Sequence, residues 1–571
     1  MDRRVPSPTN DSIELYIRTY YSLLRSSGQV QVRSLEETHR TMRSSLHSGA
    51  DSPEPDIGAF IYVAQRLPAC IAQVCLVLLG ESREVFARRG YADVEEWQPV
   101  SAPVRRRRMF FDGHERLAAY IASVSDIDDL IPHLVAYEIE WNKLHALLNR
   151  SHVTLDWDAP DATQVREALG LSGHDFERLR GLWRNKLWDT LQAIARAPKN
   201  MSVHLLAGSV NDYRKATRGW WNSVMEQSPG VDLRERPVYF VSSNTHSLVN
   251  LLVGYARQRN DDLLTTLSQD DPEQLREEAQ AAQQDPSPGR LENLLYYLLR
   301  KYLQRPGNER ELRACLDFER SHGVAYAHAQ SYLDVDVQII ELNRLDPAHF
   351  DARLNMPGLD RLHDSQAAII NIDYPLGAAA YNILTEVMAG VADLSGVYVM
   401  GKAATLNGRV GDVMIPNVAF DQHSSNTYLF RNCFAANDVA PHLRYGTVFD
   451  NQKSVSVRGT FLQNRDFMHV FYSEGYTDIE MEAGPYLSAI YEDLAPKRHP
   501  VNEIVNLFLL ARYDIGFLHY VSDTPYSRRQ ELLSKSMLYF GMDATYACAA
   551  AIVRRILQNE VGLARAYQAR G

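Results

Sequence analysis

Four short segments in the C-terminal third constrain the fold more than any other feature of the chain. Each is predicted to follow or end a buried strand, and each combines small residues with carboxylates or polar groups. They are 371–377 (NIDYPLG), 401–412 (GKAATLNGRVGD), 478–483 (DIEMEA) and 520–525 (YVSDTP). Open α/β sheets bind their ligands at strand ends, so the four segments predict one shared binding site.

Strand-like and helical patterns alternate from residue 237 onward. This alternation predicts an α/β domain over 236–571 whose mixed, mostly parallel sheet is flanked by helices. A polar stretch at about 258–320 is predicted to be a helical insertion with a helix at 290–304. Strands are predicted at 238–241, 324–328, 335–343, 366–373, 396–400, 411–420, 452–463, 468–473 and 516–522, and the other helices at 248–257, 375–390, 484–493, 500–512 and 529–560.

Helical spacing of apolar residues dominates the first 235 residues. We therefore predict a mainly α-helical accessory domain over 1–235, with residues 1–11 frayed. The apolar run 67–80 is too short to span a bilayer and is read as part of a buried helix. The predicted helices are 12–26, 58–80, 83–90, 113–124, 130–149 and 164–196.

The composition excludes several classes of function. Lys+Arg 60 against Asp+Glu 71 gives a net charge of −11, which argues against nucleic acid as a partner. Five scattered cysteines without a CxxC pair indicate neither a disulfide framework nor a thiolate metal site, and no cofactor is predicted. No secretory signal or membrane segment is visible, so a cytoplasmic location is predicted.

Two cationic or aromatic clusters in the N-terminal region have competing interpretations. The run 105–108 (RRRR) is predicted to be a solvated linker or a partner of the acidic stretch 126–129, and the alternative is a phosphate or effector site. Trp220 and Trp221 are predicted to lie in a core or domain interface rather than to form a base-stacking platform.

The order and residues of the four segments resemble the nucleoside phosphorylase/nucleosidase superfamily, and AMP nucleosidases within it most closely. The resemblance spans roughly 366–560, includes 459–465 (GTFLQNR), and is weaker over 238–260. It implies a nucleoside-phosphorylase-like fold and an N-glycosidase that releases a free purine base from a nucleoside or nucleotide such as AMP. It also implies a homo-oligomer.

The resemblance also implies roles for individual residues. Glu482 would accept the ribose hydroxyls, Met481 would pack on the sugar, and Asp523 would protonate the base at N7 as the general acid. The backbone of 401–405 would line the pocket, and Phe461 would stack on the base. The remaining substrate-binding candidates are Glu480, Gly401, Lys402, Ala403, Thr405, Arg458, Arg465, Asn244, His246 and Asp373.

Each of these residues also has a purely structural interpretation. The Glu480–Glu482 segment can start a helix, Asp523 can cap one, and Phe461 can belong to a core. The first loop, 242–246, lacks the glycine and arginine with which phosphorylases hold phosphate, so hydrolysis by water is favoured. A phosphate-dependent phosphorylase and a non-catalytic nucleotide sensor remain the alternatives.

Overall fold

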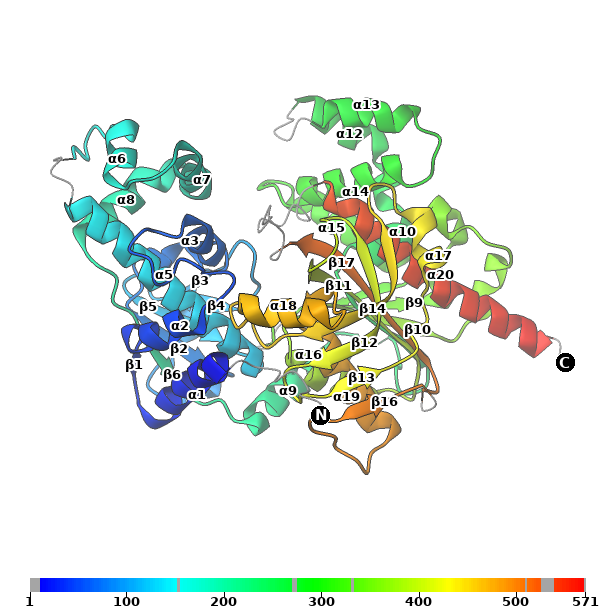
Figure 1. The fold of residues 1–571 in the computed structure, drawn as a ribbon. Coiled ribbons are helices and arrows are strands. Elements are labelled where there is room, and N and C mark those ends of the chain that lie inside the picture. The colour runs from blue at the N-terminus through cyan, green and yellow to red at the C-terminus, as the bar shows by residue number, and fades with distance from the viewer. Residues whose placement is uncertain are drawn as a thin grey trace.

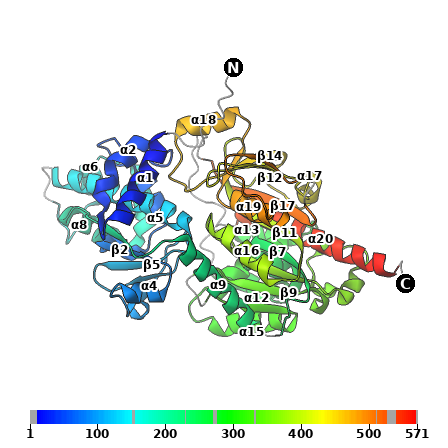
Figure 2. The ribbon, with the colours of Figure 1, turned by 90° about the horizontal axis from the view of Figure 1, so that it is seen from below.

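The computed structural model describes residues 11–150, 155–228, 230–269, 275–329, 333–508, 511–524 and 539–568. Two lobes lie side by side in both ribbon views (Figures 1 and 2), each built around its own sheet. We call them the N-terminal and the C-terminal lobe. The predicted boundary at 235/236 stays a prediction, and α9 (Val210–Gln227), which precedes it, packs on the C-terminal lobe through Trp220 and Trp221.

The N-terminal lobe is rich in helix, as expected, but it also contains a six-stranded sheet that the sequence patterns did not reveal. The strand order is β1-β6-β2-β5-β4-β3, with β2 parallel to both β5 and β6. Its strands are β1 (Val30–Gln31), β2 (Leu76–Gly80), β3 (Gln98–Val100), β4 (Met109–Phe111), β5 (Arg116–Tyr120) and β6 (Ser202–Leu205). Its helices are α1 (Asp11–Ser26), α2 (Glu36–Met42), α3 (Ile57–Ala64), α4 (Arg83–Arg88), α5 (Val124–Arg150), α6 (Ala162–Ala168), α7 (Gly173–Trp183) and α8 (Leu187–Arg196), with four 3₁₀ turns at Val32–Leu35, Ala69–Ala72, Val94–Glu96 and Arg184–Lys186.

Two helix predictions in this lobe are wrong for the same reason. The predicted helix 58–80 ends at Ala64, and its last residues form β2; the predicted helix 113–124 is the strand β5. Both strands lie between other strands, so their continuous apolar runs are buried on both faces. Such a run carries no two-residue period, and periodicity alone cannot distinguish it from a buried helix.

The C-terminal lobe contains an eleven-stranded mixed sheet. The strand order is β16-β13-β12-β14-β15-β11-β7-β10-β9-β8, and β17 pairs with both β11 and β12, which closes a ring of five strands. β10, β7, β11 and β17 are successive parallel neighbours. The strands are β7 (Pro237–Ser243), β8 (Val324–Ala327), β9 (Val337–Glu341), β10 (Ala368–Asp373), β11 (Asp393–Thr405), β12 (Val413–Asp421), β13 (Thr427–Leu429), β14 (Val448–Ser456), β15 (Asp478–Glu480), β16 (Ile504–Asn506) and β17 (Asp514–Asp523).

Helices cover this sheet on both faces, which confirms the predicted α/β class. Successive residues of β7 alternate between two cores: Val238 and Phe240 pack with α9, α16 and α19, whereas Tyr239 and Val241 pack with α10, α14 and α20. The helices are α10 (Ser247–Val253), α11 (Tyr255–Gln258), α12 (Asn260–Gln269), α13 (Arg276–Gln284), α14 (Arg290–Leu303), α15 (Glu309–Ser321), α16 (Ala379–Gly390), α17 (Ala436–Val439), α18 (Arg465–Ser473), α19 (Ala483–Leu494) and α20 (Gly541–Gln568), with 3₁₀ turns at Leu342–Arg344, Pro347–His349, Ala352–Leu354, Leu359–Asp364 and Ala440–His442.

Two predictions of element type are wrong in this lobe as well. The predicted strand 468–473 belongs to helix α18, whose first turn is capped by the Asn464 side chain. The predicted helix 500–512 contains the short edge strand β16, because Asn502 adopts a left-handed φ of 57° that interrupts a helix. Residues 1–10 and 525–538, which carry the frayed-terminus prediction and the start of the predicted helix 529–560, lie outside the described residues.

A loop of the C-terminal lobe inserts into the N-terminal core. Phe461 and Leu462 are each about 1% exposed and pack among N-terminal residues. The Ser45 amide donates to the Gln463 carbonyl at 2.7 Å, and Arg458 Nε lies 3.0 Å from Asp128 Oδ2 on α5. These contacts fix the two lobes against each other.

Candidate functional site

A cavity of about 320 Å³ lies between the two lobes. Its walls come from the loop after β10, from β11, from β15 and the start of α19, and from the end of β17. The N-terminal lobe contributes the opposite wall, including Tyr62, Arg66 and the run Arg105–Arg108. All four sequence segments that predicted a site therefore contribute to one cavity: Tyr374, Pro375 and Leu376; Gly401 to Ala404; Ile479 to Glu482; and Ser522 with Asp523.

Strand pairing explains why these segments meet. β11 continues to Thr405, beyond the predicted strand end at residue 400. Its residues Gly401 to Ala404 pair with β17, where Ala404 is the partner of Asp523. On the other side Ala404 and Thr405 pair with β15, where Ala404 is the partner of Ile479. The carboxylates of 480–482 and Asp523 therefore flank the same small residues of β11.

The two glutamates of the third segment have different surroundings. Glu480 is buried, and its Oε2 accepts hydrogen bonds from the backbone amides of Glu482 at 2.6 Å and Ala483 at 2.7 Å, while the Ser456 hydroxyl donates to its Oε1. Glu482 lines the cavity, and its Oε1 accepts from the Gly377 amide at 3.0 Å. Glu480 thus fixes the turn, and Glu482 presents a carboxylate to the cavity.

Asp523 ends β17 with one oxygen available. Its Oδ2 accepts from the Ser522 hydroxyl at 2.7 Å, whereas its Oδ1 is buried and has no hydrogen-bond partner among the described residues. A buried acceptor without a partner costs free energy, so it suits a group that meets a ligand.

Burial changes the protonation of these groups. Burial, and next the neighbouring Glu480, raise the pKa of Glu482 to about 7, although the Gly377 amide and Arg105 oppose the shift. Burial also raises the pKa of Asp523, while the Ser522 hydroxyl, Arg66 and Lys402 lower it. Both carboxyl groups can therefore exchange a proton nearer neutrality than a solvated carboxyl group.

The arginine run is both a partner of the acidic stretch and a part of the cavity wall. Arg105 pairs with Asp129 at 2.7 Å and Arg107 with Asp126 at 2.9 Å, which confirms the predicted pairing with 126–129. Arg106 pairs with Asp373, a predicted substrate-binding residue that is not among the cavity-lining residues. Arg66, which no motif pointed to, lies on the same wall.

Several predicted substrate-binding residues lie outside the cavity. Phe461 is in the N-terminal core, with its ring 5.2 Å from that of His133, and Arg458 is engaged by Asp128. Arg465 is exposed at the start of α18. Thr405 accepts from the Gly408 amide at 2.8 Å and so holds the turn after β11.

Two further candidates from the first loop have structural partners. Asn244 Oδ1 accepts from the backbone amides of His246 at 3.0 Å and Ser247 at 2.8 Å, at the start of α10. His246 Nδ1 lies 3.2 Å from the Tyr546 hydroxyl, and burial lowers its pKa to about 3. Neither residue lines the cavity, and roles for both in binding stay predictions.

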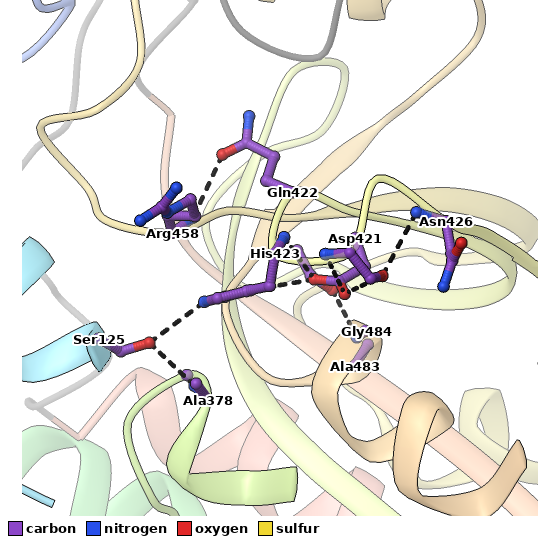
Figure 3. A network of polar contacts seen from close by, with 12 residues as sticks. Ser125, Ala378, Asp421, Gln422, His423, Asn426, Arg458, Ala483 and Gly484 are labelled. Atoms are coloured by element: carbon purple, nitrogen blue, oxygen red, sulfur yellow. Dashed lines mark hydrogen bonds and ion pairs between the residues drawn. The ribbon is translucent and has the colours of Figure 1, made fainter. Parts of the chain in front are cut away.

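A hydrogen-bonded chain connects the lobes beside the cavity (Figure 3). Ser125 Oγ on α5 lies 3.2 Å from His423 Nε2, and His423 Nδ1 lies 3.0 Å from Asp421 Oδ1. The residue types are those of a hydrolase triad, but Ser125 is fully buried and none of the three lines the cavity. Ser125 Oγ instead accepts from the Ala378 amide at 2.9 Å, next to the Gly377 amide that holds Glu482.

Neither a metal centre nor a membrane span is indicated in the part of the chain that the structure describes. Its His, Cys, Asp and Glu side chains form no group of three or more that could hold a metal ion. None of its helices combines the length and the apolar character needed to cross a bilayer.

These features define an α/β protein whose ligand cavity lies between two lobes and carries two perturbed carboxyl groups. The chain belongs to the family described as "Family of unknown function (DUF6909)", whose model matches residues 32–558. No curated protein matches the chain.

Solved structures show only partial similarity. A 5′-methylthioadenosine/S-adenosylhomocysteine nucleosidase from Neisseria meningitidis, in complex with methylthio-immucillin-A, is 13% identical over 43% of this chain and 95% of its own, with a TM-score of 0.28. A putative methylthioadenosine nucleosidase from Weissella paramesenteroides is 11% identical over 43% and 93%, with a TM-score of 0.27. A uridine phosphorylase from Schistosoma mansoni is 12% identical over 33% and 71%, with a TM-score of 0.24.

Proposed function

We propose that this protein cleaves the N-glycosidic bond of a purine nucleoside or nucleoside 5′-monophosphate and releases the free base by hydrolysis. One observation carries the proposal: Glu482, Met481 and Asp523, which belong to separate segments of the motif series, line one cavity of nucleoside size. The adenine nucleotide that the sequence resemblance implies stays a prediction.

The proposed reaction uses the two carboxyl groups differently. Glu482 accepts hydrogen bonds from the ribose hydroxyls and opposes the positive charge that develops on the sugar as the bond breaks. Asp523, whose pKa burial raises, donates its proton to the base at N7, so that the base leaves as a neutral molecule. Met481, which is buried beside Glu482, packs against the sugar.

Water is the proposed nucleophile. The first loop, 242–246, offers no arginine for inorganic phosphate, and Asn244 does not line the cavity. A phosphorylase is the runner-up, because the cavity also holds cationic side chains that could receive phosphate.

Chromatography of the free base tests the proposal. The full chain is incubated with adenosine, inosine, guanosine, uridine and their 5′-monophosphates, with and without inorganic phosphate. We expect purine release without phosphate, and a loss of about 10²–10⁴-fold in kcat/KM for Asp523→Asn and Glu482→Gln. Asp189→Asn, an exposed position on α8 outside the cavity, is the matched control. Release that requires phosphate would identify a phosphorylase, and release of no base from any substrate would contradict the proposal.

A further inference from the structure

Two cationic side chains in the cavity wall have no anionic partner. Arg66 donates to the carbonyl of Tyr62 at 3.0 Å and lies 3.4 Å above the Tyr62 ring, but no described carboxylate lies within ion-pair distance. Lys402 pairs with β17 through its backbone, but its ammonium group has no hydrogen bond or ion pair within the described part of the chain. Arg105 to Arg108, on the same wall, each have a carboxylate partner: Asp129, Asp373, Asp126 and Glu95 respectively.

Both unpaired cations belong to the end of the cavity where Asp523 lies. Lys402 lies two residues before Ala404 on β11, and Ala404 is the strand partner of Asp523 across a register shift between Ala403 and Ala404. Arg66 lines the same cavity from the N-terminal lobe, and both it and Lys402 lower the pKa of Asp523. Asp523, the proposed general acid, therefore has Lys402 and Arg66 as neighbours, and both side chains donate hydrogen bonds but cannot accept them.

Purines differ in the hydrogen-bonding groups of the edge that carries N7 and the substituent at C6, which the two cations would face. In 6-oxopurines both N7 and O6 are acceptors, whereas adenine combines the N7 acceptor with a donating 6-amino group. Lysine and arginine pair well with the N7 and O6 edge, and they leave a facing amino group without an acceptor.

From this arrangement we propose that Lys402 and Arg66 select a 6-oxopurine, such as hypoxanthine or guanine, as the base of the substrate. The inference rests on the proposed function, and it departs from the adenine nucleotide that the sequence resemblance implies. As the bond between C1′ and N9 breaks, its electron pair passes into the purine ring and onto O6, where the two cations stabilise the charge. Asp523 gives its proton to N7, and the oxygen of water bonds to C1′ and releases a proton to solvent, from which Asp523 is protonated again, so the products are a neutral base and the free sugar.

Titration calorimetry of the full chain with hypoxanthine and with adenine tests the selection without requiring turnover. We expect hypoxanthine to bind at least about tenfold more tightly than adenine. Lys402→Met and Arg66→Gln should each weaken hypoxanthine binding by about 10- to 100-fold and adenine binding by less. Lys402→Arg should retain the preference, and Lys497→Met, at an exposed position outside the cavity, should leave it unchanged. Thermal melting confirms that each variant is folded.

Several results of these measurements would contradict the inference. The inference is wrong if adenine binds as tightly as hypoxanthine, if neither base binds, or if both cation variants keep the preference. It is also wrong if these variants lose affinity for inosine 5′-monophosphate relative to inosine while hypoxanthine binding is unchanged, because the cations would then hold the phosphate. Failure of the proposed function would appear separately, as the absence of base release from every substrate.

Discussion

The carboxyl group of Glu482 accepts from a backbone amide on one side and faces the cavity on the other. Its pKa of about 7 means that it is a full acceptor only above neutrality. When pH falls through about 7 the group takes up a proton, and one acceptor for the ribose hydroxyls is lost. Binding of the sugar should therefore weaken on the acid side.

The pH profile of kcat/KM checks this expectation, because it reports the ionisation of the free enzyme. We expect kcat/KM to fall by up to about tenfold per pH unit below about pH 7. In Glu482→Gln, whose amide does not titrate, the acid limb should disappear and the remaining activity should be low. An acid limb that persists in Glu482→Gln would assign the titration to another group.

The sequence could predict these residues to different extents. Glu482 and Asp523 belong to ordered motifs, so their convergence could be expected, and Lys402 was a substrate-binding candidate within the second segment. Arg66 could not be predicted, because it comes from another lobe and no spacing connects it with the motifs. The same limit applies in reverse to Phe461: its motif is recognisable, but the motif does not reveal that its loop enters the opposite lobe.

At the scale of elements, the turn between β10 and α16 connects the interface to the site. Gly377 has a φ of 52°, and a Cβ atom placed there would lie 2.3 Å from Ser125 Oγ. The turn gives one amide to Glu482 and the next to Ser125. Both amides are therefore already occupied by protein side chains.

Gly377→Ala should consequently displace either the turn or Ser125. We expect a loss of stability of about 1–3 kcal/mol, from the left-handed backbone and the steric overlap, together with a rise in KM as Glu482 loses its amide donor. Gly181→Ala on α7 is the control, since a Cβ atom there meets nothing within 4 Å and should be neutral or stabilising. Urea denaturation and steady-state kinetics measure the two effects. Unchanged stability and KM in Gly377→Ala would contradict the role of this turn.

Element type was predicted correctly for α5, whose apolar face repeats at helical spacing, and for the buried strands β10 and β17. The errors concern β2, β5, β16 and α18, and at β2, β5 and α18 apolar residues occur in short runs that fit either type of element. In β2 and β5 the choice depends on neighbouring strands that are distant in sequence.

At the scale of the whole molecule, Phe461 shows how the lobes depend on each other. The side chain is anchored in the C-terminal lobe and packs against His39, His47, Tyr62 and His133 in the N-terminal core. Phe461 belongs to the C-terminal lobe, but its removal would leave a cavity in the core of the N-terminal lobe.

Phe461→Ala should lower the free energy of unfolding by about 3–5 kcal/mol. Urea denaturation followed by circular dichroism measures the change. Phe508→Ala, whose side chain is 50% exposed, provides the matched control and should have little effect. A Phe461→Ala protein of unchanged stability but weakened base binding would instead support the stacking role that the resemblance implies.

The position of the cavity has an energetic consequence of its own. Because its walls belong to both lobes, a ligand that fills it is bound by the docked arrangement and must stabilise that arrangement in turn. At a ligand concentration of 100 times Kd this linkage amounts to about 2.7 kcal/mol. Linkage is reciprocal, so weakening the Arg458–Asp128 contact, which touches no ligand, should reduce ligand affinity to the extent that it undocks the lobes, and at most by the factor by which the ligand strengthens docking. In this chain the substrate would stabilise the contact between the two lobes. The free energy of docking would then contribute measurably to the affinity for the substrate.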